Sequence, residues 1–497
     1  MGRGRALGKT VGRGMLLAVL AVVVGAGTAA PARAAGPLPI PVSGTRLTAD
    51  PPSRAPEAGP ADDTPCSQRL SPDEKATFWA YDYHTGRYYQ VRATLRHGGP
   101  NAWIYVEEGN RVDGGDIAEL AVLFEDIVYL RLRNLYGHEP DPGIDCEHAI
   151  TILLLNIRDA YDYKVAPFTY ISGYFDWANQ FTQAQLDDER LAKKSNEREM
   201  VYLDVLPTLP GDTIIKQSLA HEFAHLIQWR YDPEEEAWLE EGLSELAVYL
   251  CGLGHPRDHV EAFLKDPEVS LTSWAGDIRD YGKVYLFLYY LYEQVGTQRL
   301  GWLRELVADP TQGMPSLTRT LPGDRTMDEL FRDFGLALQV DDPEIGSGQY
   351  GFRNLELDRA ERPTGFGPLA AHAHGPAPLR ELTVTLPPWS LRVDRFELGR
   401  EALEIELTPQ AAICLGAGWL PGARLAPGST RHAVACPSAG DGLILPFGAT
   451  WSGRDAAVAL TVAANTWDEP VDLTLALLPE TSTTNLGTIH LPFASRR

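Results

Sequence analysis

The chain has 497 residues, with 44% hydrophobic and 22% charged side chains and a formal net charge of −23. This length predicts two folded domains together with segments outside any core. The acidic excess argues against nucleic acid or an anionic membrane as a main partner, because both carry negative charge.

The N-terminus has the pattern of a secretory signal peptide. A basic stretch over residues 3–13 precedes an apolar run over 15–27, and Ala-Arg-Ala at 32–34 supplies a cleavage pattern. The apolar run is too short to be an obvious membrane span, although an uncleaved anchor is the alternative. We therefore expect residues 1–34 to be removed and the mature protein to be secreted, with no membrane segment.

Residues 35–65 are rich in Pro, Ala, Gly and Asp, which predicts a flexible segment or pro-segment without a core. Two aromatic and β-branched runs follow, over 88–95 and 102–106, and the turn-forming residues between them predict a hairpin. Apolar residues at three- and four-residue spacing then predict an amphipathic helix over 117–135.

The next segments alternate between apolar runs and helical patterns. Strands are predicted over 149–155, 169–175 and 200–205, and the charged stretch 186–199 between them predicts a solvated loop or short helix. Helices are predicted over about 213–230, 235–252 and 281–296. Strands followed by helices indicate an α+β domain, which we place over residues 66–345.

The C-terminal third differs in composition. Residues 346–378 have the Pro and Gly content of a linker, in which His372 and His374 would be solvated rather than bound to metal. Short strands separated by turn-formers then predict a small all-β domain, sandwich-like, over residues 379–497. Those strands cover 382–386, 403–407, 456–462 and 471–477.

Five cysteines are present in a chain that we expect to be exported, so disulfides can form. Cys414 and Cys436 are the first expected pair, and Cys66 with Cys146 is the second. Cys251 would remain as a buried thiol on an apolar helix.

The chemistry is predicted to lie in residues 218–229, Ser-Leu-Ala-His221-Glu222-Phe-Ala-His225-Leu-Ile-Gln-Trp. On a helix, His221 and His225 share one face and are one turn apart, so both imidazoles can bind one Zn²⁺. Glu222 lies beside them, where a general base can take a proton from water. Apolar neighbours would bury the helix on its other faces.

A catalytic zinc needs a third protein ligand and an open position. Glu240, Glu241 and Glu245 are the candidates on the following helix. Glu241 and Glu245 share a face, whereas Glu240 is about 100° away around the helix. One of the pair can bind the metal while the other accepts the N–H of a metal-bound imidazole.

His-Glu-x-x-His followed by Trp238-Leu-Glu-Glu241-Gly resembles the gluzincin clan of zinc metallopeptidases, which includes thermolysin, and is most similar to hyicolysin-like secreted bacterial peptidases. The resemblance implies a zincin-like catalytic domain that hydrolyses peptide bonds in protein or peptide substrates. It assigns Glu241 as the third zinc ligand, Glu245 as the residue that orients His221, and Tyr281 as the donor to the oxyanion. Two features depart from the pattern: Glu240 stands where Asn is common, and the spacing to Glu241 is shorter than in thermolysin.

Other assignments fit less well. A metzincin would need Gly and His where Gln228 and Tyr231 stand. A scattered set of acidic residues forms no calcium-loop pattern, so a solvated face is predicted there rather than Ca²⁺. That set is Asp187, Asp188, Asp204, Asp212 and Asp232. A catalytically decayed zincin that binds extracellular partners through its β-domain is the alternative function, and the intact Glu222 argues against it.

Overall fold

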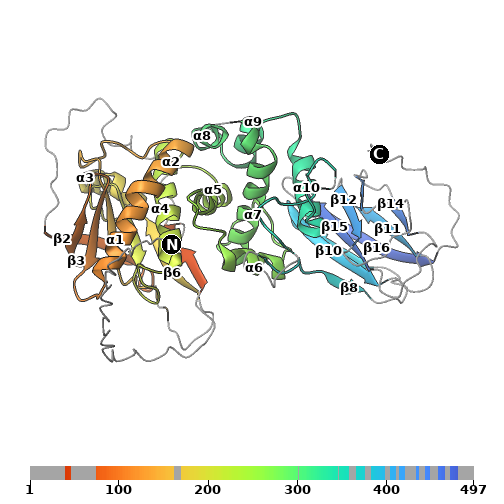
Figure 1. Ribbon diagram of the computed structural model, residues 1–497, viewed down its shortest axis with the longest axis horizontal. Coiled ribbons are helices and arrows are strands. Elements are labelled where there is room, and N and C mark those ends of the chain that lie inside the picture. Colours follow the sequence, from red (N-terminus) through yellow and green to blue (C-terminus); the bar gives the residue numbers. More distant parts are fainter. Residues whose placement is uncertain are drawn as a thin grey trace, which may run out of the picture. The chain divides into compact units, whose positions relative to one another are not determined.

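A computed structural model describes the protein at residues 40–45, 74–159, 161, 169–299, 301–344, 346–357, 365–374 and 382–397, and at six later strands given below. The chain combines helices with a mixed β-sheet and is therefore α+β, as predicted (Figure 1). The predicted signal peptide lies outside the described residues.

A seven-stranded sheet forms one side of the N-terminal part, in the order β1-β6-β7-β5-β4-β3-β2. Strands β4, β5 and β7 run parallel, whereas β6 is antiparallel to β7 and β1 is parallel to β6. Their bounds are β1 Ile40–Ser43, β2 Lys75–Asp82, β3 Arg87–Gly98, β4 Ala102–Glu107, β5 Ile150–Leu155, β6 Thr169–Phe175 and β7 Met200–Asp204.

Five of these strands, β3 to β7, lie where the sequence predicts strands, and β3 and β4 form the predicted hairpin. Strand β2 is an addition, and its inward side chains, which include Phe78 and Ala80, are buried. Asp204 corrects the prediction of a solvated acidic face. It is buried at the end of β7, where its carboxylate accepts the backbone N–H of Ile157 at 2.8 Å and burial raises its pKa to about 8.

Residues 35–65 are predicted to be a flexible segment or a pro-segment, and residues 40–45 are not flexible in the structure. Strand β1 adds to the edge of the sheet beside β6, and Ser43, Gly44 and Thr45 are buried. Composition misses this because a short edge strand needs no core of its own. Pro41 is also tolerated at an edge, where one side of the strand requires no ladder hydrogen bond.

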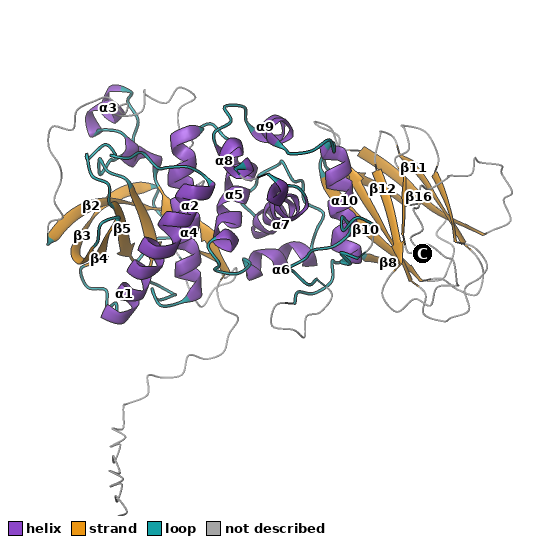
Figure 2. Cartoon of the chain, turned by 45° about the horizontal axis from the view of Figure 1, so that its top comes forward, coloured by secondary structure: helices purple, strands orange, loops and turns teal. Residues whose placement is uncertain are grey.

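Three helices carry the centre of the domain. Helix α4 (Thr213–Tyr231) packs against β6 and β7, α5 (Ala237–Leu250) packs on α4, and α7 (Ile278–Gln294) packs on α5 (Figure 2). All three lie where helices are predicted. Over the predicted helix 117–135 the chain forms α1 (Gly114–Leu123), a π-helical turn (Phe124–Val128) and α2 (Tyr129–Leu135).

The remaining helices complete this part of the chain. Helix α3 (Gln183–Asp188) ends three residues into the charged stretch 186–199. Helix α6 (Arg257–Lys265), which is not predicted from the sequence, packs against α7. Beyond α7 are α8 (Trp302–Val307), α9 (Gly313–Thr320) and α10 (Met327–Val340).

The close approach of α6 and α7 depends on Gly282. A Cβ at this position would lie 2.1 Å from the carbonyl oxygen of His259, a backbone atom that cannot rotate away. We expect Gly282→Ala to destabilise the fold by about 2 kcal/mol, because overpacking outweighs the better helix propensity of Ala. Thermal unfolding measures this. Gly114→Ala, with no atom within 4 Å of its Cβ, is the matched control. An unchanged midpoint for Gly282→Ala would contradict the packing.

Beyond α10 the chain forms short strands in two sheets, in the orders β13-β12-β15-β10-β8 and β14-β11-β16-β9. Four of them, β9, β11, β15 and β16, match the predicted strands. The bounds are β8 His372–His374, β9 Leu382–Leu386, β10 Ser390–Glu397, β11 Leu403–Pro409, β12 Cys414–Trp419, β13 His432–Ala435, β14 Leu443–Phe447, β15 Ala457–Ala464 and β16 Val471–Pro479.

The prediction of a linker over residues 346–378 is wrong for the residues of that range that the structure describes. Phe352, Leu355 and Phe366 are buried in the main hydrophobic core, a role that Pro and Gly content cannot exclude. His372 is exposed, as predicted, but the two histidines are not in a tail. They form strand β8 beside β10, and His374 Nε2 lies 2.7 Å from Asp394 Oδ1.

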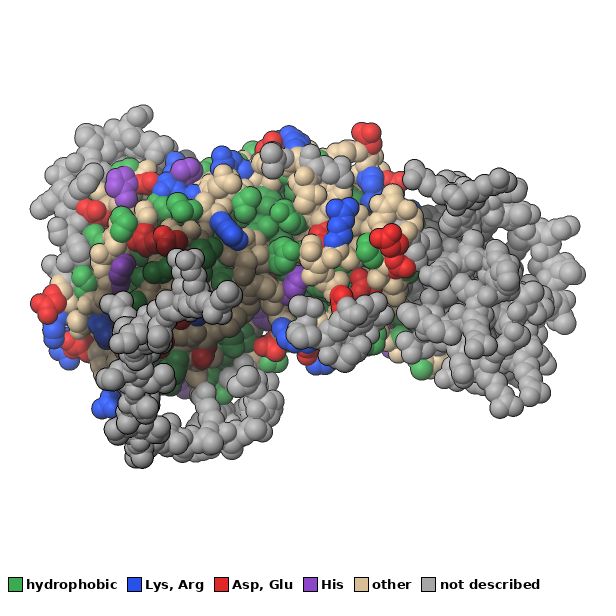
Figure 3. Space-filling model, in the orientation of Figure 1, with side chains coloured by type: hydrophobic (Ala, Val, Ile, Leu, Met, Phe, Trp, Pro, Cys, Tyr) green, Lys and Arg blue, Asp and Glu red, His purple; other side chains and the backbone are tan. Residues whose placement is uncertain are grey.

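Cys251 is free and buried, as predicted, whereas Cys146 is disulfide-bonded. The predicted pairing of Cys414 with Cys436 lies outside the residues whose side chains are described. Cys66 also lies outside them. Among the described helices, none has the length and apolar character required to cross a membrane. Acidic and basic side chains are interspersed over the described part of the face in Figure 3.

Candidate metal centre

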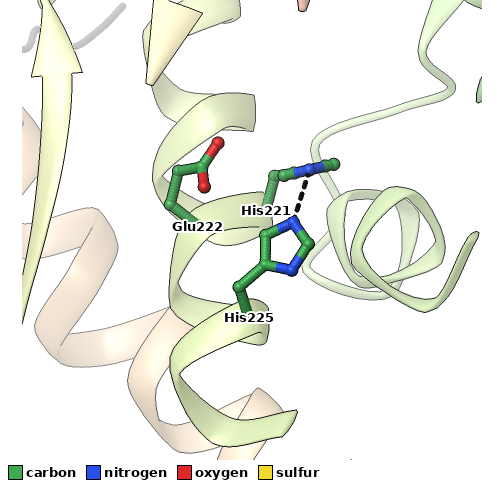
Figure 4. Close-up of side chains that lie close together, drawn as sticks. All are labelled: His221, Glu222 and His225. Carbon is green, nitrogen blue, oxygen red and sulfur yellow. Dashed lines mark hydrogen bonds between the residues drawn. The ribbon is translucent and has the colours of Figure 1, made fainter. Parts of the chain in front are cut away.

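Helix α4 places the two histidines. Its residues Leu219, Ala220, Phe223 and Ala224 are fully buried, and the Phe223 ring packs edge-on against Phe124 at 5.1 Å between centroids. This packing fixes the rotation of the helix. His221 and His225, one turn apart, therefore project from the same side of α4 (Figure 4).

Three ligand atoms from α4 and α5 converge beside this turn. His221 Nε2 lies 3.1 Å from His225 Nε2 and 3.1 Å from Glu241 Oε2, and His225 Nε2 lies 3.6 Å from Glu241 Oε2. A tetrahedral zinc with bonds of 2.0–2.1 Å to nitrogen or oxygen has ligand atoms about 3.3 Å apart. The triangle therefore has the dimensions of one face of a zinc tetrahedron.

The other ring nitrogens of both histidines face carboxylates on α5. His221 Nδ1 lies 3.3 Å from Glu245 Oε1, and His225 Nδ1 lies 3.0 Å from Glu240 Oε1. Donation from each Nδ1–H to a carboxylate assigns the tautomer in which Nε2 carries a lone pair. Two Nε2 lone pairs and one carboxylate oxygen are then directed at the same place, an arrangement that a cation satisfies.

The charge of the buried cluster also fits a cation. Glu222, Glu240, Glu241 and Glu245 surround two imidazoles, and every one of these side chains is buried. Burial alone would raise the pKa of Glu241, but its contacts with His225 and His221 hold that pKa well below its usual range. Burial likewise opposes ionisation of Glu245, yet His259 and His221 lower its pKa to about 2. Glu241 and Glu245 are therefore held ionised, and a cation would offset their charge.

Glu241 has one oxygen left over. Its Oε1 is buried and, among the residues that the structure describes, it has no hydrogen-bond partner. An unpaired carboxylate oxygen in the interior is costly unless a cation lies near it. The donor set of two imidazoles and one carboxylate is the set that zinc uses in catalytic sites with an open position, so these residues fit zinc.

Glu222 is the second carboxylate near the imidazoles, and its nearest ligand atoms lie within 4.8 Å of those of His221 and His225 (Figure 4). Glu241 Oε2 lies closer to the two Nε2 atoms, at distances expected between metal ligands. Glu222 is therefore the carboxylate that is free to act as a base. Its Oε2 accepts the hydroxyl of Thr45 at 2.7 Å. Thr45 in turn accepts the backbone N–H of Phe175 at 2.9 Å.

Tyr281 is in the first turn of α7. Its side chain lies close enough to Glu241, Glu245 and Glu222 to interact with their carboxylates. Burial first, and then Glu241, Glu245 and Glu222, raise the pKa of Tyr281 well above its usual value, so the phenol stays a donor. Its hydroxyl donates to the carbonyl oxygen of Ser43 at 3.4 Å. The ring packs against His259 at 4.9 Å between centroids.

Sequence reasoning missed three contacts of this centre. Glu240 was predicted to lie on another face of the helix than Glu241 and Glu245, but its carboxylate contacts His225 Nδ1. The Glu that stands where Asn is common in the motif therefore has a role in this site. His259 Nδ1 lies 3.2 Å from Glu245 Oε1 and extends the chain from His221. Thr45 comes from the segment predicted to be flexible or a pro-segment. A His at the third residue of α6 and a hydroxyl near the N-terminus give no sequence signal of their own.

The carboxylates behind the imidazoles give a testable effect. We expect Glu240→Gln and Glu245→Gln each to weaken zinc affinity by about 10–100-fold, because the amide no longer holds the Nδ1–H by charge. Competition with a chromogenic chelator measures it. The exposed Glu234 on the turn before α5 supplies the control, Glu234→Gln, which should bind zinc like the wild type. Wild-type affinity in both buried variants would contradict the assigned tautomers.

Comparisons with known proteins do not identify a relative. No model of a known protein family matches the sequence, and no curated protein matches it. Among solved structures, a de novo designed double-stranded β-helix matches at 11% identity over 20% of this chain and 100% of its own, with a TM-score of 0.14. A family GH115 4-O-methyl-α-glucuronidase with specificity for decorated arabinogalactans matches at 9% identity over 66% of this chain and 51% of its own, with a TM-score of 0.13. Neither likeness carries an argument about the fold.

Proposed function

We propose that this chain is a secreted zinc-dependent peptidase of the gluzincin type, with a zincin-like catalytic domain and a small all-β domain formed by the C-terminal strands. The observation that carries the proposal is the triangle of His221 Nε2, His225 Nε2 and Glu241 Oε2, with edges of 3.1, 3.1 and 3.6 Å, and Glu222 beside it. A purely structural zinc site has no use for that extra carboxylate.

The residues divide the chemistry between them. His221, His225 and Glu241 would hold Zn²⁺, which when bound acts as a Lewis acid and lowers the pKa of water toward neutrality. Glu222 takes a proton from the attacking water and passes it to the leaving amine. Tyr281, kept protonated by its surroundings, donates to the oxygen that becomes negative at the scissile carbonyl.

The surroundings favour a peptide as the substrate. A cavity of about 410 Å³ adjoins His221 and Glu222, and its apolar lining includes Ile214, Val248 and Leu253. This volume accommodates an apolar side chain beside the reacting bond. Strand β6 lies along the same region, since α4 packs directly on it, and β1 shows that this edge accepts an extended segment. Calcium has no comparable support, because the cluster of potential metal ligands among the described residues is the one formed by His221, Glu222 and His225.

Zinc content and proteolysis test the function together. The secreted chain should contain one zinc per molecule by elemental analysis and should hydrolyse casein, with activity lost in a chelator and restored by added Zn²⁺. If the protein binds zinc but hydrolyses no casein, whether or not its N-terminal segment has been cleaved, the result would favour the alternative of a decayed zincin that binds a partner. Hydrolysis that survives full zinc removal would contradict the proposal directly.

A further inference from the structure

The segment 40–45 lies along the edge of the sheet beside the candidate metal centre. Ile40, Pro41 and Val42 pair with Thr169, Tyr170 and Ile171 of β6, and the N–H of Gly44 donates to the carbonyl of Gly173 at 2.9 Å. The edge of β6 is therefore already occupied by a strand of the same chain. The residues on either side, 1–39 and 46–73, lie outside the described structure.

The same six residues contact both groups that we assign to catalysis. The hydroxyl of Thr45 donates to Glu222 Oε2 at 2.7 Å, and the hydroxyl of Tyr281 donates to the carbonyl of Ser43 at 3.4 Å. Two residues before Ser43, the carbonyl oxygen of Pro41 lies 2.8 Å from His259 Nε2. Pro41, Val42 and Ser43 also line the cavity beside His221. The base, the oxyanion donor and the cavity wall thus all meet one segment.

We propose that residues 40–45 are an autoinhibitory strand that occupies the substrate's place on the edge of β6 and leaves when the chain is cut between β1 and β2. The inference rests on the proposed peptidase function. An extended peptide binds a sheet edge through the same backbone groups that β1 now uses, and one edge accepts one strand. Substrate and β1 therefore exclude each other.

The fit of the segment is specific at Gly44. A Cβ there would lie 2.4 Å from the hydroxyl oxygen of Tyr83 and 2.8 Å from Ile171 Cγ2. The Tyr83 hydroxyl itself donates to the Gly44 carbonyl at 3.0 Å. A branched side chain at this position would clash with both groups. We therefore expect Gly44→Val to displace the strand from β6 and leave the catalytic groups in place.

A controlled cut tests the inference. In the secreted chain, residues 54–60 are replaced by the recognition sequence of a site-specific protease, and casein hydrolysis is measured before and after cutting. A tethered strand experiences an effective concentration of about 1 mM, so for a free-strand Kd of about 10 µM the cut should raise activity on the order of 100-fold at nanomolar enzyme. Circular dichroism of the cut protein verifies that it remains folded.

The outcomes separate the two hypotheses. Equal activity before and after the cut would overturn autoinhibition and leave the peptidase function standing. No hydrolysis in either state, with zinc bound, would overturn the peptidase function itself. Without any cut, Gly44→Val should activate the chain, and Thr45→Val should raise activity about tenfold, because it removes a hydrogen bond to a carboxylate.

A peptide added back gives an independent readout. A synthetic peptide spanning residues 38–48 should inhibit the cut enzyme competitively with substrate, whereas the same peptide with Gly44→Val should not inhibit. Fluorescence anisotropy with a labelled peptide measures binding without any need for turnover. Failure of the native-sequence peptide to bind or inhibit would contradict occupation of the β6 edge by this segment.

Discussion

Replacing Glu222 by glutamine is expected to lower kcat by about 10²–10⁴-fold while zinc content stays at one per chain. The amide keeps the size of the side chain and its ability to accept the Thr45 hydroxyl, which lies 2.7 Å from Glu222 Oε2, but it cannot take a proton. Binding of metal and substrate should therefore be preserved, and the loss should appear in kcat rather than KM.

The measurement is steady-state hydrolysis of a fluorogenic peptide by the activated protein, with zinc determined on the same sample. Glu234→Gln, at an exposed position before α5, is the matched control and should keep wild-type kcat. A Glu222→Gln enzyme within twofold of the wild type would show that another group acts as the base.

Replacing Glu241 by glutamine is expected to have the second largest effect, the loss of stoichiometric zinc and of all zinc-dependent activity. Its Oε2 is one corner of the ligand triangle, and the charge that offsets the cation disappears with it. Glu245→Gln should instead lower affinity by only about 10–100-fold, because Glu245 faces the outer nitrogen of His221. Isothermal titration with zinc compares the two variants.

Stability supplies a second readout for the same variant. At zinc concentrations about 1,000-fold above Kd, binding stabilises the folded state by about 4 kcal/mol, so a chelator should lower the unfolding midpoint of the wild type. Glu241→Gln should show a chelator-independent midpoint. If Glu245→Gln lost zinc completely and Glu241→Gln kept it, the third ligand would be Glu245 instead.

The histidine pair was predictable because its geometry is local. The spacing of His221 and His225 fixes their common face as soon as the segment is helical, and the apolar residues around them make it a buried helix. The competition among Glu240, Glu241 and Glu245 was not decidable from helical positions alone. It depends on how α5 is rotated against α4, and the packing lets all three carboxylates contribute to one site.

Elements that are stabilised by residues far away in the chain were not predicted from the sequence. Strand β1 is stable because β6 offers an edge and Tyr83 closes over Gly44, and neither fact is contained in residues 40–45. Helix α6 and the buried Phe352 and Phe366 were missed for the same reason, since their partners are remote in the chain. Composition describes what a segment can do alone, whereas these segments are ordered by the surfaces they meet.

The most direct test of the metal centre is a crystal structure of the zinc-loaded protein with anomalous data collected on both sides of the zinc absorption edge. The proposed function predicts one anomalous peak bonded to His221 Nε2, His225 Nε2 and a Glu241 oxygen at about 2.0–2.2 Å, with Glu222 near the metal but not bound to it. Zinc bound elsewhere, or held by Glu222 or Glu245 in place of Glu241, would contradict this assignment.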